Sequence, residues 1–195
     1  MAFQAIAFEP SRYHNELIIV SLLFGFWVQG TTEEIVCRGF VMNKLRTTWG
    51  FWPAVLINAA IFTLIHAFNP GMGVFPVINL FLFGLVFSLV FAVTDNMWLT
   101  GAAHGMWNFA QGCIFGVLVS GNRVPESILE THYLSDKGLL NGRDFGLEGG
   151  LITTLVGVVV FILLVILYQK KTKSISKIGV RNDETDAIRT TKKPI

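Results

Sequence analysis

Six polar residues with chemically useful side chains stand within otherwise apolar stretches of this sequence. They are Glu33, Glu34, Arg38, His66, His104 and Asn108. An ionisable group at the centre of a bilayer costs about 2.5–3.5 kcal/mol, so a membrane protein keeps one only with a partner or a purpose. Carboxyl, imidazole and amide groups are also the groups that proton transfer and hydrolysis use.

The two adjacent glutamates are expected to play different roles. Glu34 and Arg38 are four residues apart with the acid first, which is the favourable order for an ion pair on one helix face. Glu33 lies about 100° further round the helix and has no such partner. A carboxyl group without a cation in apolar surroundings is suited to act as a general base. The spacing therefore predicts a structural Glu34–Arg38 pair beside a catalytic Glu33.

The histidines and Asn108 could complete a hydrolytic site. His104 and Asn108 are also four residues apart, so they share a helix face, and an amide N–H can stabilise an oxyanion. His66 and His104 could hold a water or a metal beside Glu33, since two His and one Glu form a known zinc site. The sequence lacks a His-Glu-x-x-His motif. We therefore favour metal-free chemistry, with a single divalent metal such as zinc as the alternative.

Membrane-spanning helices are the elements expected to position these residues. The 195 residues are 52% hydrophobic and 14% charged, against roughly a quarter charged in soluble domains. The apolar residues gather in runs near the roughly 20 residues that cross a bilayer. The predicted fold is all-α, a polytopic transmembrane bundle of about five spans. The expected spans are 17–45, tilted or broken near residue 30, then 51–68, 74–93, 97–119 and 151–168.

Depth along these spans indicates that the candidate residues can meet. At 1.5 Å per residue from the inner helix ends, Glu33 and His66 lie about 20 Å deep. His104 and Asn108 lie about 10 and 16 Å deep on the same scale. The sequence therefore predicts one cavity within the membrane that all four side chains reach.

The charge distribution orients the chain. Lys170, Lys171 and Lys173 directly follow the last apolar run, so the positive-inside rule predicts a cytoplasmic tail over residues 169–195. That tail is polar enough to be expected as disordered. Residues 1–168 would form the membrane domain, with the motifs in 31–115, and residues 120–150 would lie outside. Nucleic-acid binding is not expected, because the basic residues form no patch with interleaved aromatic residues.

Three motifs in order resemble those of the CPBP family, the CAAX-protease and bacteriocin-processing enzymes that include the Rce1-like type II CAAX prenyl endopeptidases. The motifs are Glu-Glu-x-x-x-Arg at 33–38, Phe-x-x-x-His at 62–66 and His-x-x-x-Asn at 104–108. The resemblance covers residues 17–115, and residues 138–150 also look like a segment of some bacterial members.

The resemblance implies an intramembrane endopeptidase of the bacterial plasma membrane that acts on peptide or protein substrates, including lipid-modified ones. In that family pattern Glu33 activates water, and Glu34 and Arg38 form its supporting pair. His66 and His104 position water or substrate, and Asn108 stabilises the oxyanion.

Two other kinds of function remain open from the sequence. The same scaffold could serve non-catalytically, in bacteriocin self-immunity or as a membrane scaffold protein. A small proton-coupled transporter could instead use the carboxyl and imidazole groups as a proton relay.

Overall fold

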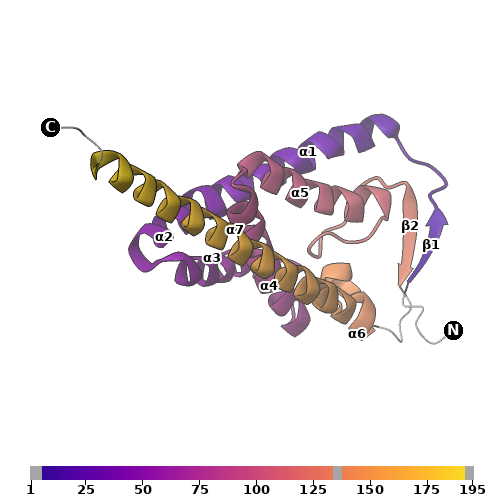
Figure 1. Ribbon diagram of the computed structural model, residues 1–195. Helices are drawn as coiled ribbons and strands as arrows, with labels where there is room; N and C mark the ends of the chain where they lie inside the picture. Colours follow the sequence, from indigo (N-terminus) through magenta and orange to yellow (C-terminus); the bar gives the residue numbers. More distant parts are fainter. Residues whose placement is uncertain (1–5, 134–137, 192–195) are drawn as a thin grey trace.

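Most of the chain folds into helices, and one small sheet lies at one end of the molecule (Figure 1). The computed structural model describes residues 6–133 and 138–191. In chain order the elements are β1 (Ile6–Pro10), α1 (Glu16–Glu34), the π-helix η1 (Ile35–Met42), α2 (Asn43–Trp49), α3 (Phe51–Ile65), α4 (Val74–Thr94), α5 (Met97–Phe109), the π-helix η2 (Ala110–Ile114), β2 (Leu129–Tyr133), α6 (Gly138–Asn141), the 3-10 turns η4 (Arg143–Phe145) and η5 (Leu147–Gly149), and α7 (Leu151–Thr191).

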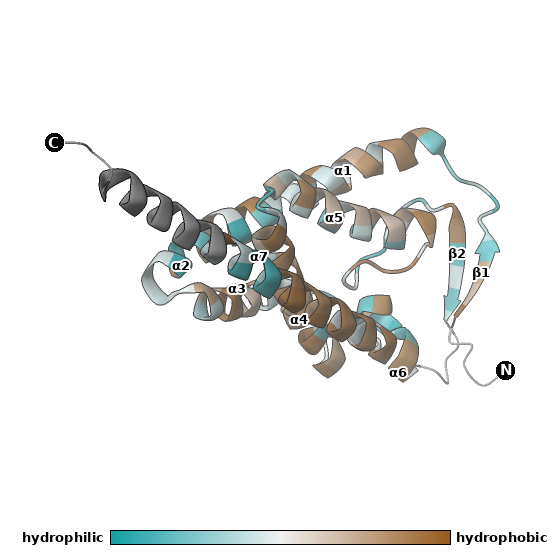
Figure 2. Cartoon of the chain, viewed as in Figure 1, coloured by the Kyte–Doolittle hydropathy of each residue, from teal (hydrophilic) through white to brown (hydrophobic). Residues whose placement is uncertain are grey.

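Two of the described helices are long and apolar enough to cross a membrane. They are α4, over Val74–Thr94, and α7, over Leu151–Ser176. Helix α3 is also apolar, but its 15 residues are fewer than the roughly 20 that a crossing needs. Figure 2 shows hydrophobic residues along α3, α4 and α7 and hydrophilic ones on α2 and parts of the strands. The bundle of about five spans stays a prediction.

The first long helix is continuous where the sequence suggested a break. Asn15 caps its start by accepting hydrogen bonds from the backbone amides of Leu17 and Ile18. The chain stays helical through Gly30 and changes to π-helical geometry only at 35–42, after which α2 follows directly. π-helical turns occur frequently at functional sites. Gly30 thus serves helix packing rather than helix breaking.

Small residues let α1 and α5 approach each other closely. A Cβ atom added to Gly105 would lie 2.6 Å from the carbonyl oxygen of Phe26. One added to Gly30 would lie 2.6 Å from the backbone nitrogen of Gly105, and one added to Gly101 would lie 2.7 Å from the Cα atom of Thr31. Gly101 and Gly105 are four residues apart, the spacing that brings membrane helices into backbone contact. This contact sets α5 directly against the part of α1 that precedes Glu33.

Two helix ends differ from the predicted spans. Helix α3 ends at Ile65 rather than near residue 68, because the ring of His66 hydrogen-bonds the carbonyl oxygen of Phe62. That oxygen is the acceptor a continuing α-helix would need. The helix formed by α5 and η2 ends at Ile114 rather than 119, ahead of Gly116, whose φ of 65° belongs to the left-handed region.

Two further features bear on the predicted fold class and tail. The fold is not purely α, because β1 and β2 pair as an antiparallel sheet with Ile6 opposite Tyr133. Helix α7 continues to Thr191, within the predicted tail, and the division into a membrane domain and a disordered tail stays a prediction. Extending a formed helix avoids the cost of nucleation, which explains how a polar segment can follow an apolar span without a break.

The helices give the molecule two distinct ends. Lys171 reaches the carbonyl oxygens of Ala92 and Val93, both at 3.0 Å, so the basic part of α7 lies beside the end of α4. Helix α2 lies at this end too, and the sheet and α6 lie at the opposite one (Figure 1). We call these the basic end and the sheet end.

The glycine contact predicts that Gly105→Ala destabilises the protein. The new methyl group would meet backbone atoms of Phe26 and Trp27 at 2.6 and 2.8 Å, and such overpacking costs about 1–3 kcal/mol. The thermal unfolding of purified protein in detergent measures this loss.

Gly25→Ala is the matched control, because nothing lies within 4 Å of a Cβ at Gly25 on α1. It should be neutral, or stabilising by up to about 1 kcal/mol through helix propensity. Equal unfolding temperatures for the two variants would contradict the assigned contact.

Candidate active site

A buried ion pair forms the base of the site. Glu34 and Arg38 are both 0% exposed, and a nitrogen of the guanidinium group lies 2.9 Å from Oε1 of Glu34. The second terminal nitrogen donates to the carbonyl oxygen of Gly84 on α4, also at 2.9 Å. Nδ1 of His104, on α5, lies 2.9 Å from the same Oε1 of Glu34. The predicted pair is therefore present, and it joins α1 and η1 to α4 and α5.

Aromatic rings enclose the ion pair and the histidines. The Arg38 guanidinium group lies over the rings of Phe62 and Phe87, at 4.7 and 5.7 Å from their centroids. Phe87 also stacks on the ring of His104 at 4.8 Å, and Phe62 lies 4.7 Å from the ring of His66. Such cation–π contacts are worth most where water is excluded, so the rings support a charge that the membrane interior would otherwise disfavour.

Glu33 has a hydrogen-bond partner on its own helix, Gln29, which the sequence analysis did not single out. The amide of Gln29 donates to Oε1 of Glu33, and Asn108 donates to Oε1 of Gln29 at 3.0 Å. Gln29 precedes Glu33 by four residues, so the helical spacing could have identified this contact. The amide chain from Asn108 through Gln29 holds one oxygen of the Glu33 carboxylate in place.

The other oxygen of Glu33 faces both histidines. Oε2 of Glu33 is buried without a hydrogen-bond partner among the described residues, and it lies 3.9 Å from Nε2 of His66 and 3.9 Å from Nε2 of His104. Nδ1 of His66 faces the Phe62 carbonyl oxygen, and Nδ1 of His104 faces the Glu34 carboxylate. Because each Nδ1 faces an acceptor, it carries the proton in the neutral imidazole. Both Nε2 atoms are then free to accept a proton. The gap between these atoms is suited to a bridging water.

A cavity of about 480 Å³ lies beside these groups. Glu33, His66, His104 and Asn108 all line it, so the predicted convergence is confirmed, and Gln29 lines it with them. Glu33 is 23% exposed by its side chain, and therefore reachable from the cavity. Glu34 and Arg38 are buried behind this wall and cannot contact a ligand.

The described residues do not assemble a complete metal site. No group of three or more His, Cys, Asp or Glu side chains within 6–133 and 138–176 is arranged to hold a metal ion. The three metal candidates, His66, His104 and Glu33, face one another as described above, but they do not form such a group. We therefore derive no catalytic step through a metal.

Glu148 is a site residue that the sequence analysis did not single out. It is 4% exposed and lines the cavity. Its Oε1 accepts hydrogen bonds from the side chains of Trp107 and Gln111, at 2.7 and 3.0 Å. Its Oε2 accepts from the backbone amide and hydroxyl group of Ser120, at 2.9 and 2.7 Å. These bonds fix the chain after η2 against α5, and so close one side of the cavity.

Comparison with known proteins gives one match. Residues 15–110, which carry all three motifs, match the protein family described as type II CAAX prenyl endopeptidase Rce1-like. No curated protein and no solved structure matches the sequence.

The different environments of the two glutamates predict different effects of substitution. Glu34→Gln leaves Arg38 buried without its counter-charge and should cost about 3–5 kcal/mol. Glu33→Gln removes a carboxylate that faces the cavity and whose hydrogen-bond partner is the neutral amide of Gln29. Because no buried cation loses its counter-charge, the fold should survive. Thermal unfolding in detergent compares the two. Similar losses of folded protein would argue against separate roles.

Proposed function

We propose that this chain, which belongs through residues 15–110 to the Rce1-like family of type II CAAX prenyl endopeptidases, is itself a peptidase. It would hydrolyse peptide bonds within the membrane. The observation that carries the proposal is the free Glu33 oxygen, which faces two unprotonated imidazole nitrogens across 3.9 Å in a cavity. A hydrolytic water needs a base of this kind within hydrogen-bond reach.

In this mechanism a water molecule lies between Oε2 of Glu33 and the two Nε2 atoms. Glu33 takes a proton from the water while the oxygen of the water bonds to the carbonyl carbon of the peptide. The tetrahedral intermediate then breaks its C–N bond, and the proton passes from Glu33 to the leaving amine. The products are a carboxylic acid and an amine, and Glu33 returns to its starting state.

The other site residues support this base. Gln29 holds the second oxygen of Glu33, and Asn108 holds Gln29. Asn108 has two amide hydrogens, of which Gln29 takes one, so the other can donate to the oxyanion of the intermediate. Glu34 fixes the ring of His104 and would stabilise it when protonated. Arg38 acts indirectly, since it holds Glu34.

The proposal includes the finer features expected from the sequence. The protein would be a multi-pass component of a bacterial plasma membrane with its C-terminal tail in the cytoplasm. Its substrates would be peptides or proteins, lipid-modified ones among them. Chemistry without a metal is favoured.

Turnover by purified protein in liposomes tests the reaction, with a peptide library read by mass spectrometry. Glu33→Gln should lower the rate by about 10²–10⁴-fold, the usual contribution of a general base. Glu9→Gln is the control, because this carboxylate on β1 is exposed and lies outside the cavity. Proton or solute flux without any peptidase activity would favour the transporter. A biological effect that survives Glu33→Gln would favour immunity or scaffolding.

Metal removal tests the chemistry separately. Dialysis against a chelator should leave the rate unchanged if the Glu33 base acts on water alone. Loss of activity that returns on addition of zinc would overturn the metal-free proposal. His66 and His104 would then be the expected ligands of the zinc ion.

A further inference from the structure

Four aromatic rings that contact one another line the catalytic cavity, and we call them the aromatic row. They are Phe83 and Phe87 on α4, and His104 and Trp107 on α5. The ring centroids of Trp107 and Phe83 lie 5.1 Å apart. Those of Phe83 and Phe87 lie 6.3 Å apart, and those of Phe87 and His104 lie 4.8 Å apart. The row is therefore continuous from His104, whose Nε2 faces Glu33, to Trp107.

A buried carboxylate holds each end of the aromatic row. Nδ1 of His104 lies 2.9 Å from Oε1 of Glu34, and the indole nitrogen of Trp107 donates to Oε1 of Glu148 at 2.7 Å. Glu34 is 0% exposed and Glu148 is 4% exposed. Hydrogen bonds to an ionised acceptor are roughly twice as strong as those between neutral groups. Both ends of the row are therefore fixed, with the two phenylalanine rings between them.

The acceptor sites of Glu148 are filled. An ionised carboxylate has about four such sites. The donors that occupy them are the side chains of Trp107 and Gln111, and the backbone amide and hydroxyl group of Ser120. The backbone of Glu148 is held as well, because the side chain of Asn79 donates to its carbonyl oxygen at 2.6 Å. Glu148 is thus suited to positioning other groups, whereas Oε2 of Glu33 has no hydrogen-bond partner among the described residues.

Trp107 lies close to the reacting groups of the cavity. It follows His104 by three residues, a helix rise of about 4.5 Å, and it directly precedes Asn108. An extended peptide advances about 3.3 Å per residue. A peptide whose scissile bond lies at Glu33 therefore brings a neighbouring side chain, within one or two residues of that bond, to the indole ring.

The cavity around the aromatic row is also apolar. Its lining includes Leu22, Phe26, Phe62, Ile65 and Leu80. An apolar substrate side chain that binds here leaves water, and the free energy gained rises with the apolar area that is buried. A ring that is already fixed loses little conformational entropy when it makes this contact. The fixed row therefore favours a large apolar side chain over a small one.

We propose that the aromatic row binds a substrate side chain next to the scissile bond, that Trp107 selects this side chain by its size, and that Glu148 positions Trp107. The inference rests on the proposed peptidase function and describes selection within the same cavity. Trp107 is the residue that the substrate contacts. Glu148 is a positioning residue, because its acceptor sites are filled and it acts through the indole ring.

The bond between Glu148 and Trp107 can be tested without turnover. Nuclear magnetic resonance of the purified protein in detergent, with isotope-labelled tryptophan, reports each indole N–H group, and Trp107→Phe identifies the Trp107 signal. Glu148→Gln removes the charge and replaces one acceptor oxygen by a donor. The Trp107 signal should then move upfield and exchange faster with water. An unchanged signal would overturn the positioning role.

Asp144→Asn is the matched control for this measurement. Asp144 is an exposed carboxylate in the same segment as Glu148, and it does not line the catalytic cavity. Its substitution should leave the Trp107 signal in place. If Glu148→Gln does not fold, Trp107→Phe removes the same hydrogen bond from the other partner and leaves the bond between Gln111 and Glu148 intact. The substrate preference of that variant then tests the positioning role.

Substrate preference tests the selection itself. The substrate is the library peptide that the wild type cleaves fastest, made with alanine or phenylalanine at each position that flanks the scissile bond. The wild type should have the lower KM for phenylalanine at one of these positions. Trp107→Leu should reduce that KM preference about tenfold, the usual effect of a lost apolar contact. Glu148→Gln and Trp107→Phe should reduce it in the same direction.

Trp98→Leu is the control for Trp107→Leu. Trp98 is on the same helix, is 68% exposed and does not line the cavity, so the wild-type preference should remain. A purely structural role of Trp107 would lower the amount of folded protein and leave the KM ratio of the two peptides unchanged. That result would overturn the proposed selection while the peptidase proposal stands. Failure of the wild type to cleave any library peptide would instead refute the peptidase proposal.

Discussion

The buried pair of Glu34 and Arg38 is the interaction on which the rest of the site depends. Two charges removed from water are stable only with close geometry and further hydrogen bonds. Arg38 meets this condition through the Gly84 carbonyl group and two aromatic rings, and Glu34 meets it through His104. Because the pair joins three helices, it fixes their relative positions. It also orients the His104 ring so that the opposite nitrogen faces Glu33.

Close helix packing makes that geometry attainable. Glycines on α1 and α5 bring the two backbones into contact, and His104 follows Gly101 by less than one turn. A side chain at either glycine contact would separate the helices and lengthen the distance between His104 and Glu34. Adjacent glutamates can therefore serve different purposes. Glu34 is enclosed between helices, while Glu33 faces the cavity from the same turn of α1.

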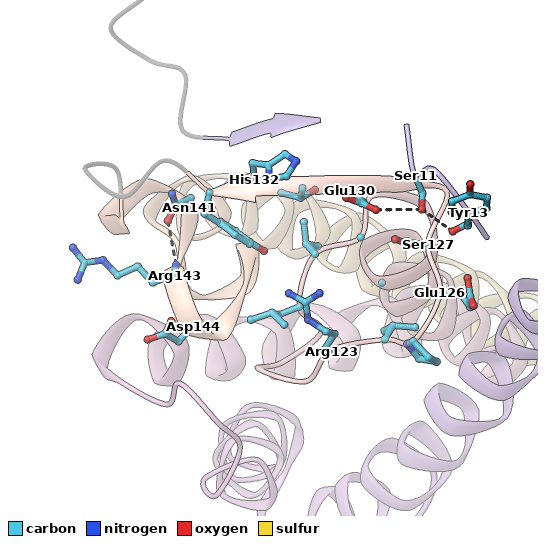
Figure 3. Close-up of a pocket in the computed structure, with 18 residues that line it drawn as sticks. Ser11, Tyr13, Arg123, Glu126, Ser127, Glu130, His132, Asn141, Arg143 and Asp144 are labelled. Carbon is cyan, nitrogen blue, oxygen red and sulfur yellow. Dashed lines mark hydrogen bonds between the residues drawn. The ribbon is translucent and has the colours of Figure 1, made fainter. Parts of the chain in front are cut away.

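The segment between η2 and α7 gives the cavity its outer wall. Glu148 accepts hydrogen bonds from Trp107 on α5 and from Gln111 on η2, and these bonds hold the segment against that helix. Its other oxygen accepts from Ser120 within the segment. Asn79 on α4 holds the backbone of Glu148 and Gly150 as well. A second cavity of about 1030 Å³ shares the lining residues 123–125 with the catalytic cavity (Figure 3). The same contacts thus shape the cavity beside the active site.

The sequence by itself determined the contacts that helix periodicity controls. Residues four apart share a face in any helix, so the Glu34–Arg38 pair and the common face of His104 and Asn108 followed from spacing alone. Helix rise similarly predicted that four polar side chains could meet in one cavity. Gln29 has the same four-residue spacing from Glu33. Its role also depends on the hydrogen bond that it accepts from Asn108, 79 residues away, and spacing does not predict that bond.

Only the tertiary structure decided the contacts between distant segments. Glu148 binds Trp107 and Gln111 across 41 and 37 residues, and β1 pairs with β2 across more than a hundred residues. No local pattern encodes such partners, because they depend on where the helices place the intervening chain. The cavity around Glu33 is decided in the same way, by the helix ends and loops that come together to line it.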